Sequence, residues 1–289
     1  MNTSSSLYSR LALLALSGVM LGSVGVGIAV AQTAPPDPNA GAITLTSGID
    51  VPSVYYFRGI RQEADPKLTL FPYGDGGIAL FSGDGPVKSA SINFGLWNSL
   101  HGGSTGSEGP SKQMHYEEDF YSTFTLGLAR GISVGATYTA YTYPNQGAAP
   151  VKEVSLKLGQ AGKIAPYGLV AFELSGQADA GSNKGTYLEL GVAPNWPIGH
   201  GMTFAIPVKV GLSLKDYYET VNGDEKFGFF DLGGLLTVPI AGIPANFGAW
   251  NVHGGVDYLR LGDGPVAIGL GTEGKKNQYV VMGGIGLSY

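Results

Sequence analysis

The stretch TFAIPVKVGLSLK, residues 203–215, alternates between apolar and polar or small side chains with a period of two. One face would carry Phe204, Ile206, Val208, Val210, Leu212 and Leu214, and the other Thr203, Ala205, Lys209, Gly211, Ser213 and Lys215. A strand separates these two sets, whereas a helix would scatter the apolar set around its circumference. The stretch also exceeds the roughly 5–6 residues of a common globular strand and suits a tilted membrane strand, which needs about 9–11.

The same period recurs along most of the chain after residue 42 and predicts twelve strands. They are expected near 42–60, 66–82, 87–99, 113–129, 132–143, 151–160, 164–176, 185–195, 201–216, 226–240, 245–260 and 276–289. Pro72 and the GDGG of residues 74–77 interrupt the second segment. Short connections alternate with longer ones, as in outer-membrane barrels with short periplasmic turns. The prediction is an all-β fold, a single antiparallel transmembrane β-barrel of about 12 strands.

Composition supports this fold and excludes several classes of function. The 289 residues include 47 glycines, 16 tyrosines and no cysteine, and only 13% are charged. Without cysteine there is neither a disulfide framework nor thiolate chemistry. A net charge of −5 argues against a nucleic-acid partner, which needs a basic surface. A secreted soluble β-sandwich is the alternative fold, although its outward faces should be charged.

The N-terminus predicts export. A polar start with Arg10 precedes an apolar run, and Ala29 and Ala31 form an A-x-A cleavage pattern. We therefore predict a signal peptide over 1–31, a flexible periplasmic lead over 32–41 and the barrel over 42–289. An uncleaved membrane anchor is the alternative interpretation of the apolar run. The expected location is the bacterial outer membrane.

The C-terminus, QYVVMGGIGLSY at 278–289, predicts the closing strand. Tyr279 and Tyr289 share a face and would lie at the two aromatic girdles of the lipid-facing surface. Trp250 and Tyr258 are expected in the same girdles. A terminal aromatic residue also predicts recognition by the barrel assembly machinery, so the expected partners are this machinery and outer-membrane lipid.

The face opposite the apolar side chains should line the lumen. The predicted lining residues are Asp50, Tyr56, Arg58, Glu117, Asp119, Glu153, Lys157, Glu189, Lys209, Asp231, His253 and Asp257. With Glu173 and Lys215 included, eight acids face four bases, an excess that favours cations in a narrow channel. The alternative is that acids and bases pair across the lumen and plug it.

Arg58 is the candidate residue of greatest interest, because it is expected near the mouth of the lumen. One interpretation makes its guanidinium a constriction or a ligand-binding cation. The other pairs it with a neighbouring acid such as Glu117 or Asp119. The two interpretations predict an open and a filled lumen, respectively.

No enzyme constellation emerges from the sequence. The four histidines, at 101, 115, 200 and 253, have no well-placed serine nearby, and no two stand at metal-ligand spacing. We therefore expect no enzyme, no metal and no cofactor. GDGP occurs at 83–86 and at 262–265, where turns with glycine at positive φ are expected in preference to calcium loops.

The stretch TLTSGIDVPSVYYFRGIRQ, residues 44–62, resembles a family of bacterial outer-membrane proteins labelled Gcw_chp. The signature residues are Phe57, Arg58, Gly59 and Gln62, and GLWNS at 95–99, EEDFY at 117–121, YTYPN at 141–145 and YLELG at 187–191 are further similarities. The resemblance implies an outer-membrane barrel and supplies no catalytic residues. The interrupted second segment and several longer loops depart from the family pattern.

The predicted function is a porin or channel for passive diffusion of small solutes or ions, with a cation preference. The alternative is a non-conducting structural or interaction barrel whose long loops bind partners. A lipid-active barrel enzyme is a third hypothesis.

Overall fold

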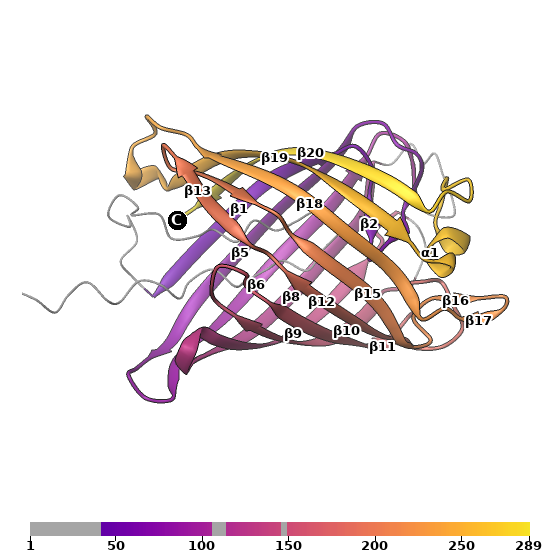
Figure 1. Cartoon of the computed structure of the whole chain (residues 1–289), viewed down its shortest axis with the longest axis horizontal. Coiled ribbons are helices and arrows are strands. Elements are labelled where there is room, and N and C mark those ends of the chain that lie inside the picture. Colours follow the sequence, from indigo (N-terminus) through magenta and orange to yellow (C-terminus); the bar gives the residue numbers. More distant parts are fainter. Residues whose placement is uncertain (1–41, 106–113, 146–148) are drawn as a thin grey trace, which may run out of the picture.

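The computed structural model describes residues 42–105, 114–145 and 149–289 as a closed antiparallel β-barrel (Figure 1). The predicted signal peptide and periplasmic lead lie outside the described residues. The wall consists of β1 (Ile43–Pro52), β5 (Thr69–Ser82), β6 (Val87–His101), β8 (His115–Leu128), β9 (Ile132–Thr142), β10 (Val151–Gln160), β11 (Tyr167–Ser175), β12 (Thr186–Val192), β13 (Asn195–Gly199), β14 (Met202–Ala205), β15 (Val208–Lys215), β18 (Phe227–Pro239), β19 (Ala249–Leu261) and β20 (Asn277–Ser288). Pairing of β1 with β20 closes the ring.

These fourteen segments form twelve barrel strands, as predicted. β12 and β13 are two parts of one strand separated by Ala193 and Pro194, and β14 and β15 are separated by Ile206 and Pro207. Each break contains a proline, which has no N–H to donate to the ladder. The backbone N–H of Ile206 still donates to the carbonyl of Pro194 at 2.9 Å, so the two strands stay paired.

The interrupted second segment is one continuous strand. β5 pairs with β1 through Pro72, and with both β1 and β6 through the glycines that follow it. A register shift between Ala79 and Phe81 leaves both Leu80 and Phe81 exposed. Asp75 faces inward and is buried, whereas the last part of the strand is exposed.

Glycine and tyrosine occupy partner positions on the inner face of the wall. Gly48 is opposite Tyr73, Gly95 is opposite Tyr121, and Gly191 is opposite Tyr167. A methyl group at any of these three glycines would overlap the partner ring. The glycine makes room for an aromatic ring lying across the neighbouring strand, which gives a physical reason for the abundance of both residues.

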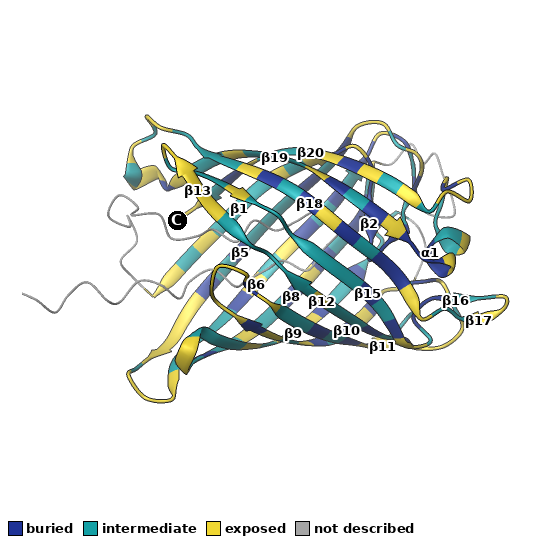
Figure 2. Cartoon of the chain, viewed as in Figure 1, coloured by how far each residue is buried: buried dark blue, intermediate teal, exposed yellow. Residues whose placement is uncertain are grey.

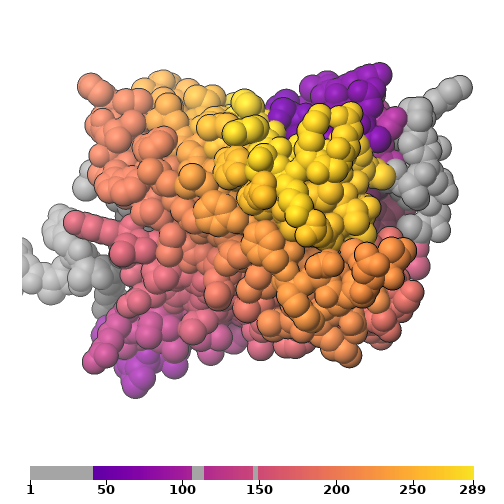
Figure 3. Space-filling view, turned by 45° about the vertical axis from the view of Figure 1, so that its right-hand side comes forward, coloured from indigo at the N-terminus to yellow at the C-terminus, as the bar shows by residue number. Residues whose placement is uncertain are grey.

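The ends of the barrel differ as the connection lengths predicted. One end has short turns, including 3₁₀ turns at Ala129–Gly131 and Ala245–Phe247. The other end has the long loops, which carry β4 (Glu63–Asp65), β7 (Ser104–Thr105), β16 (Glu219–Thr220), β17 (Gly223–Asp224) and α1 (Asp263–Ile268). Figure 3 shows the yellow loop with α1 beside the orange loop with β16 and β17. Within the described ranges, no helix is both long and apolar enough to span a membrane.

The turn prediction for the two GDGP sequences was wrong in its conformation. Among the described glycines with positive φ, none belongs to either sequence. The second GDGP instead begins α1, with Asp263 in the first helical turn. Aspartate is favourable there because its charge complements the helix dipole.

The first predicted strand ends eight residues early. β1 stops at Pro52, and the chain then leaves the wall and folds into the lumen as a small hairpin of β2 (Tyr56–Phe57) and β3 (Ile60–Arg61). Figure 1 shows β2 within the barrel near α1, and Figure 2 shows buried residues gathered at this end. We call residues 53–65 the lumen hairpin.

Candidate functional site

The tip of the lumen hairpin is a two-residue turn formed by Arg58 and Gly59. Their φ angles are 46° and 82°, and the partners Phe57 and Ile60 flank them. Positive φ at both central residues is typical of a type I′ hairpin turn. A Cβ atom at Gly59 would lie 2.9 Å from Cδ1 of Phe229, so the close approach to the wall also requires glycine. The sequence Phe57-Arg58-Gly59 thus forms a turn that places arginine inside the barrel.

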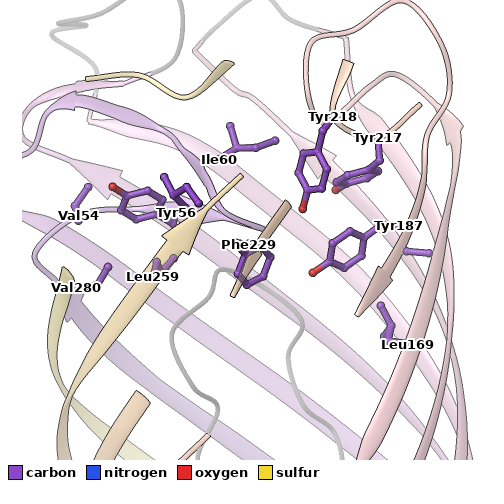
Figure 4. Close-up of a cluster of buried hydrophobic side chains, with 12 residues drawn as sticks. Val54, Tyr56, Ile60, Leu169, Tyr187, Tyr217, Tyr218, Phe229, Leu259 and Val280 are labelled. Atoms are coloured by element: carbon purple, nitrogen blue, oxygen red, sulfur yellow. The ribbon is translucent and has the colours of Figure 1, made fainter. Parts of the chain in front are cut away.

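The hairpin packs against opposite walls through alternate side chains. Tyr55 and Phe57 join one cluster of buried aromatic residues; its wall members are Phe71, Trp97, Tyr116, Tyr121, Tyr141 and Val151. Val54, Tyr56 and Ile60 join a second cluster; its other members are Leu169, Ala171, Tyr187, Tyr217, Tyr218, Phe229, Leu259, Leu261 and Val280 (Figure 4). The hairpin therefore spans the lumen and does not lie along one wall.

Arg58 makes an ion pair with Glu153 on β10. Its Nη1 and Nη2 atoms donate to the two carboxylate oxygens at 2.7 and 2.8 Å, and Nη1 also donates to the hydroxyl of Tyr217 at 2.7 Å. The guanidinium lies 4.3 Å from the ring centroid of Tyr187. The expected partners, Glu117 and Asp119, were wrong; the acid that pairs with Arg58 is Glu153.

This environment keeps Arg58 charged. Burial alone lowers the pKa of its guanidinium, but attraction to Glu153 and the polar ring of Tyr217 outweighs burial, so the pKa is raised. A bidentate carboxylate satisfies the planar guanidinium better than a single acceptor would. The Tyr218 hydroxyl donates to the Arg58 carbonyl at 2.9 Å and holds the strained backbone from the other side.

Glu63 forms a second anchor at the base of the lumen hairpin. It is 0% exposed, and its carboxylate accepts bonds from the Tyr55 backbone N–H and the Thr69 hydroxyl, each at 2.6 Å. His101 Nδ1 lies 2.7 Å from the same carboxylate. Burial raises the pKa of Glu63, but the bonds from His101 and Thr69 outweigh burial and lower it.

Acid should therefore weaken this anchor. Because the folded-state pKa is lowered, the stability that Glu63 contributes is present above the ordinary value of 4.5 and is lost as pH falls through the folded-state pKa. We expect Glu63→Gln to lower the free energy of unfolding at neutral pH by about 1–3 kcal/mol and to reduce its dependence on pH below 4.5. Denaturant unfolding across pH measures both effects. Glu273→Gln, which changes an exposed loop carboxylate, is the control. The same dependence of the unfolding free energy on pH in the native protein, Glu63→Gln and Glu273→Gln would contradict the role assigned to Glu63.

Glu117 and Asp119 lie side by side on the inner face of β8, 3% and 0% exposed. The Tyr55 hydroxyl donates to Glu117 at 2.9 Å, which ties this pair to the hairpin. Both carboxylate oxygens of Asp119 are buried, and this carboxyl group lies beside that of Glu117. Among the described residues, neither acid forms an ion pair with a basic side chain, and Arg58 pairs with Glu153.

A second group of charges lies nearer the middle of the wall. Lys209 lies 3.3 Å from Asp231, its register partner on β18. Glu189 accepts bonds from the Tyr167 and Tyr187 hydroxyls at 2.8 and 2.7 Å. Three other predicted residues are also inside: Asp257 is buried, Lys157 lies 4.5 Å from the Tyr167 ring centroid, and His253 Nε2 is 2.8 Å from Asp50.

All twelve predicted lining residues are buried or half-buried, and their role in lining a pore stays a prediction. The predicted location of Tyr56 and Arg58 was wrong, because these residues lie on the lumen hairpin and not on a wall strand. Lys215 is also a correction: its side chain is 73% exposed and contacts Asp216 at the rim. Sequence reasoning missed Glu63, Asp75 and Tyr217. Asp75 lay in the interrupted segment, whereas Glu63 and Tyr217 lie in connections that the strand pattern does not cover.

The predicted girdle residues lie on the outer face or at its ends. Tyr279 is 66% exposed and lies 5.4 Å, between ring centroids, from Tyr258. The indole N–H of Trp250 donates to the carbonyl of Phe247 at the short-turn end. Tyr289 exchanges two backbone hydrogen bonds with Leu45, so the last residue of the chain belongs to the seam of the barrel.

The remaining candidate groups are the histidines and a cleft among the long loops. His115 bonds Asn98, and His253 bonds Asn251 as well as Asp50. Within the described ranges, no group of three or more metal-ligating side chains is arranged for a metal ion. A cleft of about 560 Å³ lies among the long loops, lined by residues that include Glu219, Glu225 and Ile268. The expectation that the chain is not an enzyme stays a prediction.

Comparison with known proteins gives only distant matches. No family model and no curated protein matches the chain. Among solved structures, outer-membrane phospholipase A from Escherichia coli is 13% identical, with 84% of this chain and 92% of that chain covered and a TM-score of 0.44. OmpF from Salmonella typhi is 11% identical, with 89% of this chain and 99% of that chain covered and a TM-score of 0.39. The translocator domain of the autotransporter NalP from Neisseria meningitidis is 12% identical, with 87% of this chain and 89% of that chain covered and a TM-score of 0.38. The fold assignment accordingly rests on the strand pairing of the chain itself, and these matches assign no function to it.

Proposed function

We propose that the chain is a bacterial outer-membrane barrel through which small solutes or ions diffuse passively, with a preference for cations. The observation that carries this proposal is the excess of acidic over basic side chains in the interior. Among the described residues, buried acids such as Asp119, Glu153 and Asp257 outnumber the inward bases Arg58, Lys157 and Lys209. Acidic side chains in a narrow channel with low-dielectric walls attract cations and repel anions.

The outer face supports the membrane location. Large apolar side chains are exposed on many strands, among them Ile49, Leu232, Val256 and Val281. An apolar surface that continues around a barrel would favour aggregation in water, whereas lipid tails would cover it. The lumen hairpin narrows the end with the long loops, so we expect a small conductance.

Single-channel recording in planar bilayers under a salt gradient tests this function. For the native protein we expect a reversal potential whose sign shows that cations permeate more readily than anions. Glu117→Gln combined with Asp119→Asn should move that potential towards zero, because the variant removes two acidic groups beside the hairpin that form no ion pair with a base in the described part of the chain. Asp84→Asn with Glu273→Gln removes two exposed acids and is the matched control. An unchanged potential in the Glu117 and Asp119 variant would contradict the assignment.

A non-conducting barrel is the second candidate, and the packing of the hairpin favours it. Tyr55 and Glu63 are both 0% exposed, so no water path passes either side chain in this conformation. Such a barrel would act through its loops, where the cleft near Glu219 lies. A folded, heat-modifiable barrel that inserts into bilayers without conductance would favour this candidate over the channel.

A further inference from the structure

The environment of the Arg58 guanidinium has the composition of a ligand site. Apart from Phe57, the groups around it belong to the barrel: Glu153 on β10, Tyr187 on β12, and Tyr217 in the loop after β15. Glu153 supplies a bidentate acceptor, and the two tyrosine rings have their centroids 4.3 and 5.3 Å from the guanidinium carbon. A carboxylate together with aromatic faces is the recognised arrangement for binding organic cations. We call these three residues the Glu153 cage.

The group that fills the cage comes from a different part of the chain. Arg58 is 95 residues from Glu153 and 159 residues from Tyr217 in sequence. It stands at the tip of a hairpin, and its own backbone has a positive φ that is unfavourable for a residue other than glycine. The hairpin thus places a guanidinium in the cage as a separate ligand would. The turn that carries this guanidinium has a strained backbone.

We propose that the Glu153 cage is a binding site for solutes that carry a guanidinium group, and that Arg58 is an internal occupant which such a solute displaces. The chemistry favours guanidinium over ammonium, because two carboxylate oxygens match the planar fork, the Tyr187 ring centroid lies 4.3 Å from the guanidinium carbon, and the Tyr217 hydroxyl accepts a further N–H. This site assigns a solute class to the proposed channel. It rests on the proposed function, because the solute would reach the cage through the lumen. Binding itself is independent of conduction.

Vacating the cage tests the site directly. Purified Arg58→Ala barrel in detergent is titrated with methylguanidinium chloride at millimolar concentration while its thermal unfolding is followed. We expect the midpoint to rise by several degrees. The double variant with Glu153→Gln should not respond, because the carboxylate that holds the cation is gone. Propylammonium should bind roughly tenfold more weakly, since it offers no bidentate fork.

Two controls separate the cage from general salt effects. Sodium chloride at equal ionic strength should leave the midpoint unchanged. Arg260→Ala removes an exposed arginine that donates to the Asn277 amide oxygen, and this variant should not respond to methylguanidinium. If Arg58→Ala does not fold, Arg58→Gln, which keeps most of the side-chain volume, takes its place with the same expectation. A midpoint that does not move, or moves equally in Arg260→Ala, overturns the proposal.

Displacement of Arg58 in the native protein is tested by uptake of methylguanidinium into proteoliposomes. We expect uptake that saturates in the native and Arg260→Ala proteins, and at least a tenfold higher half-saturation concentration in Glu153→Gln. Uptake that stays linear in the native protein overturns the proposal that solutes displace Arg58, while the channel function stands. A cage that binds methylguanidinium in a barrel without ion conductance contradicts the channel function and supports the site.

Discussion

Replacing Arg58 with alanine is expected to lower the free energy of unfolding of the barrel by about 3–5 kcal/mol. The change leaves the Glu153 carboxylate buried at 2% exposure, without the cation that binds both of its oxygens. It also leaves Tyr187 without the guanidinium that stacks on its ring. Equilibrium unfolding in urea, in detergent micelles or lipid vesicles, measures the loss.

A double-mutant cycle identifies the source of this loss. Glu153→Gln in the Arg58→Ala background removes the unpaired charge, so the double variant should be less destabilised than the sum of the single variants. Arg260→Ala removes an exposed arginine and should change the free energy by no more than about 0.5 kcal/mol. Additive effects of Arg58→Ala and Glu153→Gln would show that the pair is not coupled as its geometry indicates.

Removing the lumen hairpin is expected to raise single-channel conductance several-fold. Asp50 on β1 is the register partner of Phe71 on β5, which places Pro52 close to Thr69. Residues 54–67 can therefore be replaced by a four-residue turn such as Gly-Asn-Gly-Ser without stretching the two strands. The change empties the part of the lumen that two aromatic clusters now fill.

The matched control shortens a loop that lies outside the lumen. β16 and β17 form a protruding hairpin whose Val221 is fully exposed, and replacing 219–224 by a short turn should leave conductance unchanged (Figure 1). Far-UV circular dichroism and heat-modifiable migration confirm that both shortened barrels fold. Equal conductance with and without the lumen hairpin would show that it does not limit permeation.

The wall could be predicted from the sequence because its signal is local. Alternation such as that of residues 203–215 indicates which side chains face outward, and most strands show it independently. The lumen hairpin gives the same local signal, because VYYFRGIR also reads as a continuation of β1. Whether an apolar stretch remains in a wall or folds across a lumen depends on the opposite strands, which a local pattern does not contain.

Partner choice inside the lumen could not be predicted for a related reason. Arg58 reaches Glu153 and not the acids of β8, because a type I′ turn at Arg58 and Gly59 directs the guanidinium toward β10. The turn type was visible in principle, since an Arg-Gly pair between the apolar residues Phe57 and Ile60 suits a two-residue hairpin. The depth and direction of insertion follow from the whole ring, including the space that Gly59 leaves for Phe229.

The lumen hairpin has a mechanical consequence for the barrel. Its alternate side chains press on opposite walls, and its tip and base are fixed by Arg58 and Glu63, so it acts as a cross-brace inside one mouth. At the other mouth β14 continues the wall between β13 and β18, and β13 has no second partner strand within the ranges that the structure describes. Bending stiffness should therefore fall along the axis from the braced mouth to the free one. Lateral pressure from lipid would therefore deform the barrel less at the end with the long loops than at the end that carries the C-terminus.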